Sequence, residues 1–224
     1  YNANLNYNRK QVIGRGFATI DVTGFYSYFT NKINGDFDTD PNKIIYDNMK
    51  GHAISRGISL NLEGSFNIPL RVMAGITYMN VYQMEDTGTG LFKTIQIQAP
   101  QWSGNFAITY TLPRGFMIDL TGKWNGPMRL PLLPNDYRPE YSPWFCIANV
   151  QLTKRIGKQV EVYGGIKNLL NFVPQNPIIR AHDPFDKKVN DPIDNPQGYT
   201  FDPSYNYASL QGLRGFLGIR YTMK

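Results

Sequence analysis

The sequence predicts an all-β chain that forms part of an antiparallel transmembrane β-barrel. Three observations predict this fold: about nine strand-like stretches follow one another, short and long connections join them alternately, and apolar and polar residues alternate within them. Barrels of outer membranes have tight turns at one end and long loops at the other. A soluble sandwich has no reason to keep its long loops at one end.

The connections divide the predicted barrel into two ends. The short joins are Gly14-Arg15-Gly16, Asn67-Ile68-Pro69, Pro113-Arg114-Gly115 and Gly157-Lys158-Gln159. The long connections, which we expect to be extracellular loops, cover residues 31–52, 84–100, 126–143 and 173–212. Complete single-chain barrels of bacteria have an even number of strands. The odd count therefore predicts that residues 1–224 are the C-terminal portion of one larger barrel domain, preceded by an N-terminal part.

The individual stretches show the alternation that separates the two faces of a strand. In residues 20–28 and 54–66, apolar side chains fall on one parity, whereas Asp21 and Glu63 fall on the other. The later stretches that repeat this pattern are residues 101–112, 116–125, 160–172 and 213–223. We expect the apolar parity to face lipid and the polar parity to face the lumen.

The length of the stretches and their aromatic ends favour a membrane barrel over a soluble sheet, which also alternates when one face is wet. Many stretches reach ten to fourteen residues, whereas soluble strands have about 5–6 and a tilted membrane strand needs about 9–11. Aromatic residues at the ends of the apolar faces resemble interfacial belts. They are Tyr26, Tyr28, Phe66, Tyr78, Tyr82, Trp102, Trp124 and Trp144.

The composition excludes several other classes. No stretch approaches the roughly 20 apolar residues of a transmembrane helix. The formal net charge is +6, but the basic residues are scattered singly, so we expect no nucleic-acid partner. Cys146 is the single cysteine, so an internal disulfide is impossible. Its position among apolar residues predicts a buried or lipid-facing side chain rather than a catalytic thiol.

Charged residues concentrate on the parity that we expect to face the lumen. They are Asp21, Glu63, Asp119, Lys123, Arg155, Glu161, Lys167, Arg214 and Arg220. A basic side chain facing lipid at mid-depth costs about 2–4 kcal/mol, which explains why charges gather on the other face. Because both signs occur, ion pairs that solvate the wall are favoured over a track for an anionic solute.

Two segments near the C-terminus resemble a known family. Residues 162–171 (Val-Tyr-Gly-Gly-Ile-Lys-Asn-Leu-Leu-Asn) resemble the penultimate strand of TonB-dependent outer-membrane receptors, with its Gly-x-Lys-Asn-Leu-x-Asn core. Residues 210–221 resemble their last strand, and residues 124–131 and 137–142 are similar to receptors of gut-type Gram-negative bacteria. Members of this family usually end on an aromatic residue, whereas this chain ends Tyr221-Thr222-Met223-Lys224.

The resemblance implies a 22-strand barrel with an N-terminal plug, of which this chain would supply the last nine strands. It implies a receptor in the outer membrane of a Gram-negative bacterium that imports a scarce nutrient (a siderophore, cobalamin, haem or a glycan) and is driven by TonB. The TonB complex would act through the N-terminal part. Outer-membrane lipid and lipopolysaccharide are the other partners we expect, and the sequence leaves open whether a surface lipoprotein caps the barrel.

The longest connection holds the candidate ligand contacts, because receptors meet their ligands through loops. The candidates are Arg180, His182, Tyr199, Tyr205 and Tyr207. Five aspartates occur there, but four lie within two residues before a proline, which is turn chemistry. Their spacing matches no EF-hand loop, and His182 has no second ligand at a metal-site spacing. We therefore expect no metal site and no cofactor.

No enzyme motif is present, such as a Gly-x-Ser-x-Gly elbow, a His-Glu-x-x-His helix or a phosphate-binding glycine loop, so we expect no catalysis. Two alternatives to a transporter remain open. One is a non-transport barrel that acts as an adhesin or surface scaffold. The other is a soluble secreted β domain that binds carbohydrate through its Tyr and Trp residues. The sequence leaves the cargo and the oligomeric state undetermined.

Overall fold

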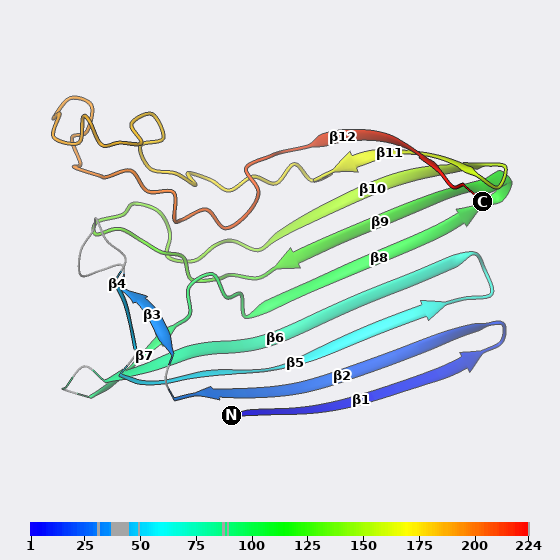
Figure 1. The fold of residues 1–224 in the computed structure, drawn as a ribbon, viewed down its shortest axis with the longest axis horizontal. Coiled ribbons are helices and arrows are strands. Elements are labelled where there is room, and N and C mark those ends of the chain that lie inside the picture. Colours follow the sequence, from blue (N-terminus) through cyan, green and yellow to red (C-terminus); the bar gives the residue numbers. More distant parts are fainter. Residues whose placement is uncertain (31, 37–44, 49, 87, 89, 224) are drawn as a thin grey trace.

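The computed structural model describes residues 1–30, 32–36, 45–48, 50–86, 88 and 90–223 (Figure 1). Within these residues the chain is all-β apart from one 3-10 turn, η1 (Pro113–Gly115). No helix among them is long and apolar enough to cross a membrane. The described residues therefore confirm the all-β class.

Nine antiparallel strands follow one another in chain order across the main sheet. They are β1 (Asn2–Ile13), β2 (Gly16–Phe29), β5 (Gly51–Ser65), β6 (Leu70–Asp86), β8 (Trp102–Leu112), β9 (Phe116–Asn125), β10 (Phe145–Ile156), β11 (Val160–Lys167) and β12 (Arg214–Tyr221). The sheet does not close on itself, and β1 and β12 are its edges. Nine is the number of strands that the sequence predicts.

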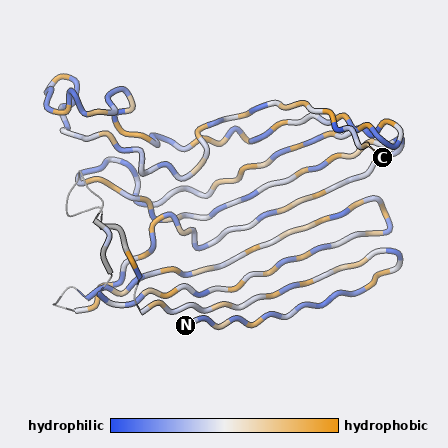
Figure 2. The backbone as a smooth tube through the Cα atoms, viewed as in Figure 1, coloured by the Kyte–Doolittle hydropathy of each residue, from blue (hydrophilic) through white to orange (hydrophobic). Residues whose placement is uncertain are grey.

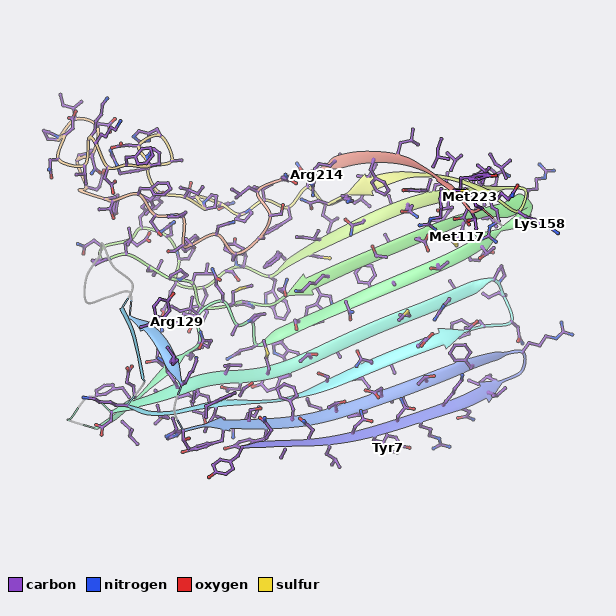
Figure 3. All side chains as sticks on the ribbon, in the orientation of Figure 1. Tyr7, Met117, Arg129, Lys158, Arg214 and Met223 are labelled. Atoms are coloured by element: carbon purple, nitrogen blue, oxygen red, sulfur yellow. The ribbon has the colours of Figure 1, made fainter. Side chains whose placement is uncertain are left out.

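The short turns lie together at one end of the sheet and the long connections at the other (Figure 1). Gly14 and Gly157 occupy the left-handed region in two of the short turns, with φ of 62° and 63°, a conformation that costs glycine little. The backbone N–H of Arg15 donates to Asn67 Oδ1 over 2.7 Å and joins two neighbouring turns. Figure 3 shows Lys158 in a short turn and Arg129 in a long connection, at opposite ends of the sheet.

The long connections differ from simple loops in two places. The first contains a hairpin of β3 (Ile33–Asp36) and β4 (Ile45–Asn48), and the second contains β7 (Leu91–Ile95), which pairs with β6. Residues 31, 37–44, 49, 87 and 89 of these connections lie outside the described residues. Residues 126–143 and 173–212 are irregular, with isolated bridges Arg129↔Tyr141 and Ile179↔Asp202.

β11 is shorter than the alternation in residues 160–172 predicts, because it ends at Lys167. Asn168 and Asn171 have φ of 52° and 50°, a left-handed conformation that asparagine tolerates better than most residues but that no strand contains. The Asn168 side chain then bonds to Phe172 through both its amide group and its carbonyl oxygen, at 2.7 and 3.0 Å. The chain therefore turns where the pattern still looks like a strand.

The register joins the apolar parities of the nine strands into one continuous face. Direct partners such as Ile108↔Leu120 and Gly164↔Leu217 share it, and Figure 2 shows the alternation along each strand. Leu217 is 81% exposed. A soluble domain does not leave so extensive an apolar surface uncovered, so this face is suited to lipid rather than to water.

Glycines in the middle of strands lie beneath aromatic rings of the neighbouring strand. The direct cross-strand pairs are Gly104↔Trp124, Phe106↔Gly122, Tyr163↔Gly218 and Gly165↔Phe216. In each pair the ring occupies the space of a Cβ, the nearest ring atom lying 2.4–2.8 Å from the position that the Cβ would take. The ring covers backbone that a glycine leaves bare, which stabilises the pair.

Candidate functional site

The nine charged residues predicted for the inner wall all lie on the polar face of the sheet. Glu161 is directly opposite Arg155 on one side and Arg220 on the other. Its carboxylate accepts hydrogen bonds from them over 2.8 and 3.2 Å. Glu63 pairs with Arg71 at 2.5 Å. The sequence alone did not indicate this partner, because only the register shows that Arg71 lies on the same face as Glu63.

The other two acidic residues predicted for the inner wall bond to neutral groups. Asp21 accepts from the amides of Asn6 and Asn8 at 3.1 and 3.2 Å. Asp119 accepts from the Thr109 hydroxyl at 2.6 Å. The four carboxylates predicted for the inner wall thus have hydrogen-bond partners within the chain.

On the polar face of β9, β11 and β12, three cations near the long connections have no acidic partner among the described residues: Lys123, Lys167 and Arg214. Lys167 is directly opposite Arg214, and its ammonium lies 5.4 Å from the Phe216 ring centroid. Arg214 donates to the neutral side chain of Gln211. Both signs occur on the face, as the sequence predicts. The ion pairs of Glu63 and Glu161 lie near the short turns, whereas the part of β9, β11 and β12 near the long connections carries the three cations without an acidic partner.

Above this cationic region, two long connections are joined by the buried side chain of Arg138, which is 4% exposed. Its Nη2 donates to Asp136 at 2.7 Å and also to Asp202 in the other connection. Burial by itself would raise the pKa of Asp136, but hydrogen bonds from the Arg138 side chain and backbone outweigh it and lower that pKa. The two carboxylates in turn raise the pKa of Arg138 despite its burial.

A small apolar core accompanies this ion pair. It consists of Met128, Leu130, Phe145 and Tyr205, with Phe172 and Tyr207 packed against it. Phe145 belongs to the polar parity of β10, opposite Asn125, so the core sits over the polar face. The Tyr205 hydroxyl donates to the Pro139 carbonyl at 2.8 Å, and burial raises the pKa of Tyr205 and of Tyr207.

A second buried arginine, Arg180, organises the tip of the longest connection. Its Nη2 donates to Asp183 at 2.7 Å and to Asp194 at 3.0 Å. The backbone N–H of Lys188, followed by Arg180, lowers the pKa of Asp183. His182 is the main cause of the lowered pKa of Asp194, whose carboxylate lies 3.3 Å from the ring nitrogen.

An open cavity of about 360 Å³ lies where the two connections meet. Its wall includes four aromatic rings, those of Tyr137, Phe172, Tyr205 and Tyr207, and Arg138 and Asn171 add polar groups. This volume is at the lower end for small-molecule sites. The flat rings suit a ligand with planar or apolar surfaces.

The five predicted ligand contacts do not form one cluster. Tyr205 and Tyr207 line the cavity together, with ring centroids 6.1 Å apart. Arg180 and His182 share Asp194 at the loop tip, and Tyr199 donates its hydroxyl to the Asn135 carbonyl at 2.8 Å. Arg180 and Tyr205 are only 8% and 2% exposed, so their polar groups act within the loops.

Several cavity residues were missed by sequence reasoning. Tyr137 and Arg138 lie in a tract that the sequence marks only as similar to a family, and Phe172 lies in a predicted strand. For Tyr137 and Arg138, the sequence pattern that could have indicated the site is the Tyr-Arg-Pro-Glu-Tyr run at residues 137–141. Two aromatic residues lie near an arginine there, within a long connection. Among the described residues, no group of three His, Cys, Asp or Glu side chains could hold a metal ion.

Comparison with known proteins gives matches in sequence and in structure. The family model of the TonB-dependent receptor-like β-barrel matches residues 1–169. No curated protein sequence matches the chain. Similar solved structures include the ferric-catecholate import receptor Fiu of E. coli, with 12% identity and a TM-score of 0.64, covering 99% of this chain and 27% of that one.

Two further structures are similar over almost the whole chain. One is FpvA of P. aeruginosa bound to heterologous pyoverdines, with 14% identity and a TM-score of 0.61, covering 98% of this chain and 26% of that one. The other is the FrpB iron transporter of Neisseria meningitidis, with 10% identity and a TM-score of 0.59, covering 98% and 31%. The chain spans only about a quarter to a third of these proteins, and at such identities the likeness shows the fold.

Proposed function

The chain belongs to the TonB-dependent receptor-like β-barrel family, a family of Gram-negative outer-membrane barrels, and we propose that it is part of a receptor that imports a scarce nutrient with energy delivered through TonB. The observation that carries this proposal is the two-faced sheet of nine strands. Its apolar residues share one face from β1 to β12, and its polar face ends beneath an ordered pair of long connections.

The proposal fixes an orientation. The apolar face contacts lipid, the polar face lines the lumen, the short turns are periplasmic and the long connections are extracellular. The TonB complex acts through a part of the protein upstream of this chain. Lipopolysaccharide and a surface lipoprotein that caps the loops are the further partners of this receptor.

The chemistry of the site indicates what kind of cargo would fit. Lys123, Lys167 and Arg214 form a cationic region below the aromatic cavity. The carboxylates on β9 and β11, Asp119 and Glu161, are bonded to other groups. A negatively charged cargo with flat surfaces would be attracted by this region. Among the nutrient classes considered, ferric siderophores and haem have these properties more than cobalamin or a neutral glycan does.

Uptake by the full-length protein in a Gram-negative host tests the proposal. The probes are a radiolabelled ferric catecholate, haem, cobalamin and a fluorescent oligosaccharide, each supplied at limiting concentration with and without a protonophore. We expect uptake of one probe that stops when the inner membrane is de-energised. Binding without energy-dependent uptake of any probe would contradict the transport role.

A charge-matched pair of variants tests the cationic region. Replacing Lys123, Lys167 and Arg214 together by Gln should lower uptake of an anionic probe about tenfold or more, because charge-assisted bonds are lost. The control replaces Arg15, Arg114 and Lys158 by Gln, which removes the same charge from three short turns. Equal uptake by the two triple variants would exclude a role for the cationic region.

A surface adhesin or scaffold is the second candidate, and one observation favours it. Ion pairs of Arg138 and Arg180 within the chain itself hold the longest connection in one conformation. A preformed surface that binds another macromolecule would have the same property. Attachment of cells that carry the protein, measured together with uptake, separates the two functions. Attachment with no uptake in any condition would favour the adhesin.

A further inference from the structure

One row of polar side chains interrupts the apolar face. Tyr26 on β2 is directly opposite Arg56 on β5, and Arg56 is directly opposite Asn80 on β6. Direct partners in antiparallel strands project to the same side, with Cβ atoms about 5 Å apart. A hydroxyl, a guanidinium and an amide therefore lie side by side on the surface that carries mainly apolar residues.

The position of this row is defined by the strand that carries Arg56. Below it on the same face of β5 follow Ile58, Leu60 and Leu62, and the strand turns at Phe66. Ten residues at about 3.4 Å each, tilted by about 45°, cover about 24 Å of depth. The apolar band of such barrels is about 25 Å tall, so the row lies at the edge of the band that adjoins the long connections.

The side chain of Arg56 has no hydrogen bond or ion pair with the residues that the structure describes. Asp21 on β2, Glu63 on β5 itself and Glu85 on β6 lie on the opposite face. Asp86, which shares the parity of Asn80, is six positions further along β6. The guanidinium of Arg56 is exposed at the edge of the hydrocarbon layer and has no counter-charge in the described part of the chain. This favours an anion supplied by the membrane.

Aromatic and basic groups surround the row as they would at a headgroup layer. Tyr78 and Trp102 pack below it with ring centroids 4.8 Å apart. Tyr28 and His52 stack above it at 5.1 Å. Such rings favour the boundary between hydrocarbon and headgroups.

We propose that Arg56, flanked by Tyr26 and Asn80, binds a phosphate group of a phosphorylated glycolipid in the outer leaflet. The guanidinium fork matches two phosphate oxygens, and the phenol and amide supply further donors. This assignment to the outer leaflet rests on the orientation in the proposed function. At the opposite end of the same face, Lys154 donates to the Arg114 carbonyl and lies 4.0 Å from the Phe116 ring centroid, so its charge is already engaged.

The test is lipid retention by the full-length protein reconstituted in phosphatidylcholine nanodiscs that contain diphosphorylated lipid A, measured by native mass spectrometry. Arg56→Gln should retain about tenfold less lipid A than the unmodified protein, as expected for the loss of charge-assisted bonds. The matched control is Arg9→Gln, which removes the same charge from the same face near the short turns and should retain lipid A fully. Arg56→Lys keeps the charge without the fork and should retain an intermediate amount.

Two further lipids complete the test. The unmodified protein should retain lipid A without phosphates only weakly, at the level at which Arg56→Gln retains diphosphorylated lipid A. It should also retain less phosphatidylglycerol than diphosphorylated lipid A. Equal retention of lipid A by Arg56→Gln and the unmodified protein would overturn the proposal. Equal retention of the lipid without phosphates, or of phosphatidylglycerol, would overturn it too.

Failure of this proposal is distinguishable from failure of the proposed function. Nanodiscs present the glycolipid in both leaflets, so retention does not depend on orientation or on transport. Orientation is read separately from a cysteine at Lys158. Labelling of that cysteine from outside intact cells would contradict the orientation in the proposed function and leave the lipid measurement unchanged.

Discussion

The guanidinium of Arg138 lies 4.1 Å from the ring centroid of Tyr205. The two residues belong to different long connections, and the same guanidinium bonds to Asp202 near Tyr205. A cation–π contact and a buried ion pair therefore act at one point. The two connections form one unit over the polar face, and the cavity exists because they are held together there.

Replacement of Arg138 by Met should open this unit. Removing one partner of a buried ion pair costs about 3–5 kcal/mol, because the remaining charge is left uncompensated. We expect amide hydrogen exchange in residues 173–212 to rise strongly, while exchange in the strands stays unchanged. Arg114→Met, in an exposed short turn, is the control. Similar exchange in the two variants would show that Arg138 does not hold the connections together.

Acid should loosen the longest connection at a defined point. The pKa values of Asp183 and Asp194 are lowered in the folded protein, so their ionised forms stabilise the folded loop. This contribution is complete above the ordinary aspartate pKa of 3.8 and is lost as the pH falls through the lowered values.

Hydrogen exchange of residues 173–212, corrected for intrinsic rates, should therefore be constant from neutral pH down to the ordinary aspartate pKa and rise only below it. Asp183→Asn should already show raised exchange at neutral pH. A gradual loss of protection between neutral pH and that point would contradict the role of these carboxylates.

The aromatic rings over glycines predict a steric effect that depends on position. In Gly122→Ala the new Cβ would meet Phe106 at 2.4 Å, and such overpacking costs about 1–3 kcal/mol. Gly24→Ala, on the same face, has nothing within 4 Å of the new Cβ and should be neutral. The temperature of unfolding, followed by heat-modifiable gel mobility, measures both. Adding Phe106→Ala should remove the penalty at Gly122, and an equal shift in the two glycine variants would refute the account.

Much of the fold was predictable from the sequence because local signals determine it. The period of two in residues such as 116–125 shows the faces of a strand, and Gly14 and Gly157 mark the tight turns. The end of β11 was not predictable, because Asn168 is compatible with a strand and turns only when its amide meets Phe172.

The candidate site was less predictable because it depends on contacts between distant segments. Arg138 and Asp202 are 64 positions apart, and no spacing rule connects them. The parity of Lys123 and Lys167 shows that both lie on the polar face. Their positions relative to one another along the strands follow only from the register. An arginine in a long connection can contact a ligand or hold the loop together, and the sequence does not distinguish these roles. The burial of Arg180 shows that it holds the loop together.

The most direct test of the account is cysteine labelling of the full-length protein in native outer membranes. Single cysteines at Ile118, Asp119, Leu217 and Arg220, in a Cys146→Ala background, are exposed to a charged maleimide from the aqueous phase. We expect labelling at Asp119 and Arg220, which lie on the polar face, and protection at Ile118 and Leu217, which face lipid. Equal labelling at all four positions would contradict a membrane barrel.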